Sequence, residues 1–141
     1  MKAEQIFSLA NLLAMIGWLL LAIAPRWQFT RKIVLSGAIP LLLSVAYLVL
    51  IVLFFGQSEG SFGSLAGVMK LFTNQWAVLA GWIHYLAFDL FIGAWEVKDA
   101  QARGVSHWFV VPCLFLTFML GPIGLLLYHG ARLVAAKGSV K

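Results

Sequence analysis

The sequence predicts an all-α integral membrane protein: a bundle of four transmembrane helices with a short interfacial helix before the third. Of its 141 residues, 62% are hydrophobic and 11% are charged, whereas a soluble domain is about 45–50% apolar and about 25% charged. The apolar residues also gather into runs of about twenty, the length of helix that crosses a bilayer. The chain is therefore expected to be a single membrane domain over residues 1–141.

The first predicted span covers residues 5–24, and Pro25 follows it. This apolar run is longer than the ~7–15 residues of a signal-peptide core, so we interpret it as a transmembrane helix. Asn11 within it is expected to hydrogen-bond a neighbouring helix or to contact a ligand. The second span covers residues 33–55, and Pro40 in its first half is expected to kink the helix or open its hydrogen-bond ladder.

A Gly- and Ser-rich segment separates the second span from residues 65–73. Their apolar side chains recur at helical spacing beside Lys70, which indicates a short helix in the membrane interface, or an early first turn of the next span. The third span covers residues 75–95 and ends at Trp95, in the aromatic belt. Glu96 and the charged residues that follow it are expected to form a solvated connection.

The fourth predicted span covers residues 108–129. Gly121 and Pro122 within it should interrupt the helix at membrane depth, where neighbouring protein or a cavity must satisfy the freed backbone groups. Two interpretations stay open. The small residues make room for a flat apolar ligand, or they allow close packing of helices.

The basic residues are interpreted as topology and lipid-headgroup charges. The net charge is +5, but the ten Lys and Arg lie singly in the loops and at the ends, without the stripe that binds nucleic acid. Membrane lipid, and not nucleic acid, is therefore the expected partner. With four spans, the two sides of the membrane carry equal numbers of basic residues. The cluster Arg26, Arg31 and Lys32 favours its loop inside and both termini outside.

The third span holds an imidazole and a carboxyl group, which are costly at membrane depth and are therefore functional candidates. On a straight helix, His84 and Asp89 point about 140° apart, so they do not face one pocket as a simple pair. Tyr85 lies one turn before Asp89 on the same face. Phe88 on the adjoining face and Trp82 further down complete one wall of a predicted cleft.

Asp89 admits a catalytic and a structural interpretation. An ionised carboxylate in hydrocarbon costs at least about 2.5–3.5 kcal/mol, so Asp89 must stay protonated, pair with a cation or face water. A protonated carboxyl suits a general acid, and the alternative is a hydrogen bond between helices. His84 could likewise be a satisfied core residue. His107 and His129 lie at other depths, so no metal site and no cofactor are expected.

Two runs resemble those of the abscisic-acid-deficient-four-like family, which includes plant neoxanthin synthase. They are HYLAFDLFIG, from His84 to Gly93, and Pro112-Cys113-Leu114 followed by TFMLGPIGLLLY, from Thr117 to Tyr128. The resemblance covers nearly the whole chain. It implies an integral membrane protein that acts on carotenoids. The plant reaction opens the epoxide of violaxanthin and forms an allene without net redox change.

On this resemblance, the expected function is binding or acid/base isomerisation of a carotenoid or other polyisoprenoid, and the isomerisation needs an acid and a base. From residue chemistry, Asp89 is the candidate acid, and His84 or Tyr85 is the candidate proton relay or base. The candidate substrate-binding residues are Trp82, Phe88, Asn11, Gly121 and Pro122.

Two other functions stay open. One is a non-enzymatic structural or lipid-binding membrane subunit. The other is a carotenoid-cleaving oxygenase, a reaction associated with related members that needs a metal or another oxygen-activating device. Because no plastid-type transit segment is evident, the chain is expected to be a bacterial member of the family, multi-pass in the inner membrane. Assembly into a homo-oligomer is left open.

Overall fold

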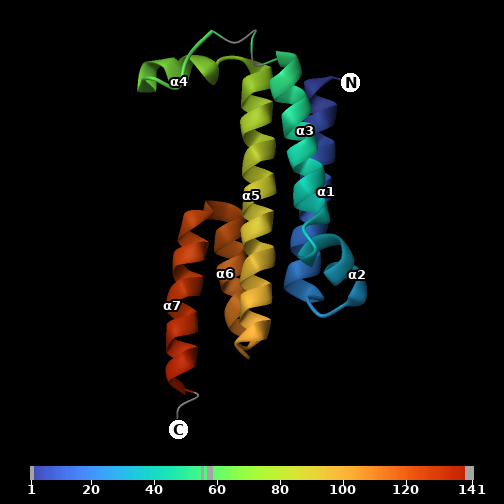
Figure 1. Cartoon of the computed structure of the whole chain (residues 1–141), viewed down its shortest axis with the longest axis vertical. Coiled ribbons are helices and arrows are strands. Elements are labelled where there is room, and N and C mark those ends of the chain that lie inside the picture. The colour runs from blue at the N-terminus through green and yellow to red at the C-terminus, as the bar shows by residue number, and fades with distance from the viewer. Residues whose placement is uncertain (1, 55, 57–58, 139–141) are drawn as a thin grey trace.

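The computed structural model describes residues 2–54, 56 and 59–138, which form helices joined by short turns, with no strand among them (Figure 1). In chain order, the elements are α1 (Ala3–Ile23), α2 (Gln28–Thr30), the π-helical turn η1 (Arg31–Leu35), α3 (Ala38–Phe54), α4 (Leu65–Leu71), α5 (Gln75–Ala102), α6 (His107–Leu120) and α7 (Pro122–Gly138). Within the described residues, three segments are long and apolar enough to cross a membrane: Ala3–Ile23, Gln28–Phe54 and Gln75–Ala102. The first three predicted spans are therefore present, and the predicted count of four is not confirmed.

Helix α5 is the centre of the molecule and packs against α1, α3 and the α6–α7 pair (Figure 1). Small residues let α1 approach it closely. A methyl group on Gly93 would lie 2.6 Å from the ring of Trp18, and one on Gly17 would lie 2.8 Å from Leu90. Without a hydrophobic driving force between helices in lipid, such close van der Waals contact is what holds spans together.

The second span is interrupted earlier than Pro40 predicts. Gly37, at φ +86°, separates the η1 turn from α3, and the Ser36 hydroxyl donates to the carbonyl oxygen of Lys32 at 2.6 Å. Pro40 then lies in the first turn of α3, where the backbone N–H groups have no helical partner in any case. The helix is therefore interrupted at Gly37, and Pro40 in the first turn of α3 costs little stability because it removes no hydrogen bond there.

A short helix before the third span is confirmed as α4, which lies across the end of α5 (Figure 1). The Ser64 hydroxyl begins it by accepting a hydrogen bond from the Gly67 amide at 3.1 Å. Lys70 pairs with Glu59 of the preceding loop at 2.9 Å, and this pairing lowers the pKa of the exposed Glu59 carboxyl. Exposed apolar side chains such as Met69 suit a helix that lies on the membrane surface.

The predicted fourth span is not one helix. Helix α6 ends at Leu120, the backbone reverses at Gly121 with φ +46° and ψ −95°, and α7 begins at Pro122. With 14 residues, α6 is about 21 Å long, shorter than the ~30 Å hydrocarbon core. A methyl group on Gly124 would overlap Thr117, so the two helices pack closely. The predicted break is thus real, but it folds the chain back as a hairpin.

The hairpin changes which end of the molecule carries the C-terminal residues. Figure 1 shows the N-terminus and α4 at one end, and the α1–α3 connection, the α5–α6 turn and the end of α7 at the other. The expectation that both termini share a side was therefore wrong, because the α6–α7 pair returns to the end from which it started.

Candidate functional site

The Asp89 carboxyl lies at the tip of the α6–α7 hairpin, near the middle of α5. It is half-buried, and a methyl group on Gly121 would lie 3.1 Å from its Oδ1 and 3.3 Å from its Oδ2. Oδ2 is buried without a hydrogen-bond partner among the described residues. Because Gly121 also has a positive φ, a side chain there would strain the backbone and crowd the carboxyl group. The reversal of the chain thus brings backbone against an acid at membrane depth.

Tyr85 is the companion of Asp89, as the helical spacing predicted. Its hydroxyl donates to the carbonyl oxygen of Phe118 at 2.8 Å, which ties α5 to the last turn of α6. The Trp82 ring lies 5.5 Å from the Tyr85 ring, and the Trp82 indole N–H donates to the Asn11 side-chain oxygen at 3.0 Å. Tyr85, Trp82 and Asn11 therefore form one wall on α5 and α1, and Asp89 follows Tyr85 by one helical turn.

His84 and Phe88 lie on the other side of α5. Their ring centroids are 4.7 Å apart, and the His84 ring lies 5.6 Å from that of Tyr47 on α3. His84 thus points toward α3, whereas Asp89 meets the turn at Gly121, and Phe88 lies with His84 and not in the wall of Tyr85, Trp82 and Asn11. The predicted site residues on α5 therefore divide between two faces of that helix, while Asn11 lies on α1 and Gly121 and Pro122 form the hairpin turn.

Glu96 is a polar group that the sequence analysis missed. The expected solvated connection after Trp95 does not exist, because α5 continues to Ala102. Glu96 is 0% exposed, and its Oε1 accepts a hydrogen bond from the Thr117 hydroxyl at 2.9 Å. Its Oε2 is buried without a partner among the residues described. The spacing in the sequence could have revealed this position, because Glu96 follows Asp89 by two helical turns and therefore lies on the same face of α5.

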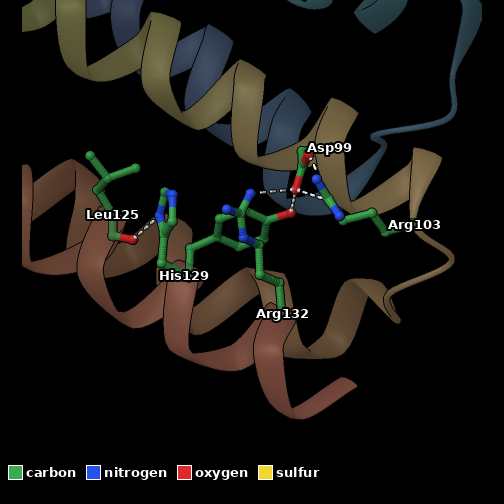
Figure 2. Close-up of polar contacts among 6 residues, drawn as sticks. Asp99, Arg103, Leu125, His129 and Arg132 are labelled. Atoms are coloured by element: carbon green, nitrogen blue, oxygen red, sulfur yellow. Dashed lines mark hydrogen bonds and ion pairs between the residues drawn. The ribbon is translucent and has the colours of Figure 1, made fainter. Parts of the chain in front are cut away.

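Asp99 continues this polar face to the end of α5 (Figure 2). It accepts hydrogen bonds from the Tyr128 hydroxyl at 2.7 Å and from Arg103 Nε at 2.8 Å, and Arg132 lies 3.4 Å away. The Asp99 carboxylate raises the pKa of the Arg103 guanidinium. These contacts join α5 to α7, so the carboxyl groups on this face of α5 all meet the hairpin.

The three histidines occupy three different surroundings. His107 hydrogen-bonds the carbonyl oxygen of Ala22 at 2.8 Å. His129 hydrogen-bonds the carbonyl oxygen of Leu125 at 3.0 Å (Figure 2), and its ring stacks on that of Trp95. No group of three or more His, Cys, Asp or Glu side chains in the described part of the chain could hold a metal ion. His107 and His129 are thus engaged with backbone.

Three surface hollows flank α5, and Asp89 lines none of them. Two lie along α3, with volumes of about 490 and 300 Å³, and His84 and Phe88 respectively line them. The third, of about 310 Å³, lies beside α1 and is lined by Phe7 and Trp82. The wall that leads to Asp89 therefore starts at this third hollow.

Comparison with known proteins gives one family. The model of the "ABA DEFICIENT 4-like" family matches residues 5–128. The chain is 25% identical over 112 residues to "Protein ABA DEFICIENT 4, chloroplastic" from Arabidopsis thaliana, an alignment that covers 74% of this chain and 51% of that protein. The chain thus spans about half the length of the curated relative it matches. No solved structure matches.

Proposed function

Because the chain belongs to the ABA DEFICIENT 4-like family, we propose that it acts on a carotenoid or similar polyisoprenoid at the tip of the α6–α7 hairpin. The substrate class comes from the family resemblance, and the chemistry comes from Asp89. One observation carries the proposal: a carboxyl group in the middle of α5 that faces a helix break and has a buried, unpaired oxygen.

The proposed chemistry is acid/base isomerisation. In the proposed cycle Asp89 starts as the neutral acid, a form favoured by its buried, unpaired Oδ2 and by the cost of an ionised carboxylate at this depth, at least about 2.5–3.5 kcal/mol. It donates its proton to an epoxide oxygen or a polyene carbon, and the resulting carboxylate accepts a proton from a neighbouring substrate carbon. The substrate gains one proton from Asp89 and returns one to it, so the reaction needs no oxidant. Tyr85 lies beside Asp89 as a positioning group, and His84 faces away.

The approach of the substrate is proposed along the aromatic wall. The hairpin lies beside only the half of α5 that is distant from α4 (Figure 1), and Trp82 beyond its tip is 40% exposed. The Phe7 and Trp82 rings lie 5.6 Å apart, and Tyr85 follows. A flat polyene packed on these rings would bring its end group to Asp89.

The test is pigment analysis of cells that produce an epoxidised carotenoid together with the protein. Wild type should convert the pigment, Asp89→Asn should abolish conversion, and Tyr85→Phe should reduce it. Glu59→Gln is the matched carboxyl-to-amide control, because Glu59 lies in an exposed loop, and it should convert normally. Pigment that stays unchanged with wild type and Asp89→Asn alike would remove the enzymatic function.

A non-enzymatic subunit is the second candidate, and a specific contact favours it. Asp89 lies against the residue that precedes α7, and a carboxylate near the N-terminus of a helix stabilises that helix. Together with the Glu96–Thr117 bond, it would then simply hold the hairpin in place. Under this proposal Asp89→Asn lowers stability in detergent, and no pigment changes with any variant.

We also propose an inner-membrane location with the α5–α6 turn inside. Basic residues concentrate in the elements at this end: the α1–α3 connection carries Arg26, Arg31 and Lys32, the end of α5 carries Lys98 and Arg103, and α7 carries Arg132. The elements at the other end, the start of α1 and α4, carry Lys2 and Lys70. The positive-inside rule then favours the basic end in the cytoplasm. Reporter fusions after residue 138 and in the loop before α4 should report opposite sides, and equal sides would contradict the hairpin.

A further inference from the structure

The α1–α3 connection and the end of α5 together form a cationic surface. It carries four exposed basic residues from two segments far apart in the chain, here called the basic patch: Arg26, Arg31, Lys32 and Lys98. The Gln101 side-chain amide donates to the carbonyl oxygen of Pro25 at 3.3 Å, and Lys98 lies one turn earlier on the same side of α5. The tertiary structure therefore adds a fourth cation to the three that are close in the sequence.

The acidic residues of the chain leave the basic patch without a counter-charge. The sequence has five of them, all described, and each lies elsewhere. Glu4 and Glu59 belong to the opposite end, and two more carboxyl groups meet the hairpin within the span. The fifth, Asp99, already pairs with Arg103 and Arg132 (Figure 2). Negative charge for the basic patch therefore has to come from another molecule.

Two exposed aromatic rings show where the basic patch sits relative to a bilayer. The Trp27 side chain is 56% exposed and that of Phe29 is 48% exposed, and their ring centroids lie 5.3 Å apart. Such rings are stable at the membrane surface, where their apolar bodies meet acyl chains and the indole N–H meets polar groups. Because Arg26 precedes this pair and Arg31 follows it closely, the cations lie at the depth of the lipid headgroups.

An anionic phospholipid combines the two kinds of group that this surface would bind. Its phosphate carries a negative charge at headgroup depth, where a guanidinium or ammonium group can donate hydrogen bonds to it. Its acyl chains can pack on the exposed rings. A zwitterionic phospholipid carries an ammonium group of its own, which opposes the attraction. A soluble acidic partner would meet the charges but leave the rings without an apolar contact.

We propose that the basic patch binds an anionic phospholipid, with the phosphate between the α1–α3 connection and Lys98 and the acyl chains against Trp27 and Phe29. This site rests on the membrane location proposed above, and not on the reaction proposed at Asp89. It is distinct from the hairpin contacts, because Asp99 neutralises the arginines there.

The test offers the full chain, purified in a nonionic detergent, equal amounts of dioleoyl phosphatidylglycerol and dioleoyl phosphatidylcholine. These lipids share their acyl chains and differ in headgroup charge, and mass spectrometry of the intact complexes counts the lipids retained. Wild type should prefer phosphatidylglycerol. The double variant Arg31→Gln with Lys32→Gln should lower this preference about thirtyfold, the ratio given by two charges of about 1 kcal/mol each. Lys2→Gln with Lys70→Gln, the matched control at the opposite end, should keep it.

A second double variant tests whether the two segments form one site. Arg26→Gln with Lys98→Gln changes one cation of each segment and should also lower the preference, because the phosphate lies between them. Monodisperse elution and an unchanged thermal midpoint show that each variant is folded. Inorganic phosphate in large excess should leave phosphatidylglycerol bound, because it lacks acyl chains to pack on Trp27 and Phe29.

Four results would overturn this inference. They are equal retention of both lipids by wild type, a preference that survives either patch variant, the same loss in the Lys2 and Lys70 control, or displacement of the lipid by inorganic phosphate. The control result would show that net charge alone matters, and displacement would show a site for soluble anions. Lipid retention is measured without pigment, so its failure is distinguishable from a failure of the reaction at Asp89.

Discussion

The two faces of α5 bind their neighbours in different ways. Toward the hairpin, the contacts are close and polar: Tyr85 bonds a backbone carbonyl, Glu96 bonds Thr117, and Asp99 bonds Tyr128. Toward α3, the contacts are apolar: Leu43 and Leu50 are buried in the core, the Tyr47 ring meets that of His84, and hollows of about 490 and 300 Å³ remain beside them. The comparison teaches that one apolar helix can be held by polar contacts on one face and by apolar packing on the other, and that only the apolar face keeps these two hollows.

The largest expected effect lies where the hairpin closes. Gly124→Ala places a methyl group into the backbone and hydroxyl of Thr117, so we expect the free energy of unfolding to fall by about 3 kcal/mol. Gly130→Ala on the same helix meets nothing within 4 Å and should instead stabilise by about 0.5–1 kcal/mol. Thermal unfolding in detergent measures both. Equal effects would show that the α6–α7 packing is not tight.

The buried hydroxyl of Thr117 is the next test of the polar face. Thr117→Val removes the donor to Glu96 and leaves a buried carboxyl unpaired, which should cost about 1–3 kcal/mol. Thr30 is equally buried, but its hydroxyl has no partner among the described residues, so Thr30→Val should be neutral or stabilising. Chemical denaturation of the two variants compares them directly. If Thr117→Val is also neutral, Glu96 does not hold the hairpin.

A pair of tyrosines contrasts the two faces at a smaller scale. Tyr85→Phe loses the hydrogen bond to Phe118 and should lower the free energy of unfolding by about 1 kcal/mol. Tyr47 lines the larger hollow on the α3 side, and its contact with His84 is between the two rings. Tyr47→Phe keeps the ring, so it should change the free energy of unfolding by less than about 0.5 kcal/mol. The thermal midpoints of both variants should differ in this order. The reverse order would mean that the α3 face of α5 contributes more to stability at these positions than the hairpin face does.

The smallest expected effect concerns the ion pair between α4 and the loop that precedes it. Lys70 lowers the pKa of Glu59 from its ordinary value of 4.5, so the pair stabilises the fold above that value and the contribution is lost as the pH falls through the lowered pKa. Glu59→Gln should therefore lower the thermal midpoint slightly at neutral pH and not at all in acid. A difference that persists in acid would assign the effect to something other than the ion pair.

Much of the fold follows from local pattern. The first three spans, the short interfacial helix and the break at Gly121 were all predicted, because span length, helical spacing and the Gly-Pro pair are properties of neighbouring residues. Helical angles also predicted that Tyr85, and not His84, accompanies Asp89. Glu96 was misassigned because polarity after Trp95 resembles the end of a span, whereas α5 continues to Ala102.

The sequence by itself determined that the chain forms helices long and apolar enough to cross a membrane, with an acid and an imidazole at different angles on the third of them. Only the tertiary structure decided that the chain turns back at Gly121, and that turn places backbone beside Asp89, buries Glu96 and moves Arg132 to the basic end. The physical reason is that a glycine with positive φ permits a reversal as well as a kink. Which one forms depends on the packing of Gly124 against Thr117, a contact between two helices that the pattern of either helix alone does not specify.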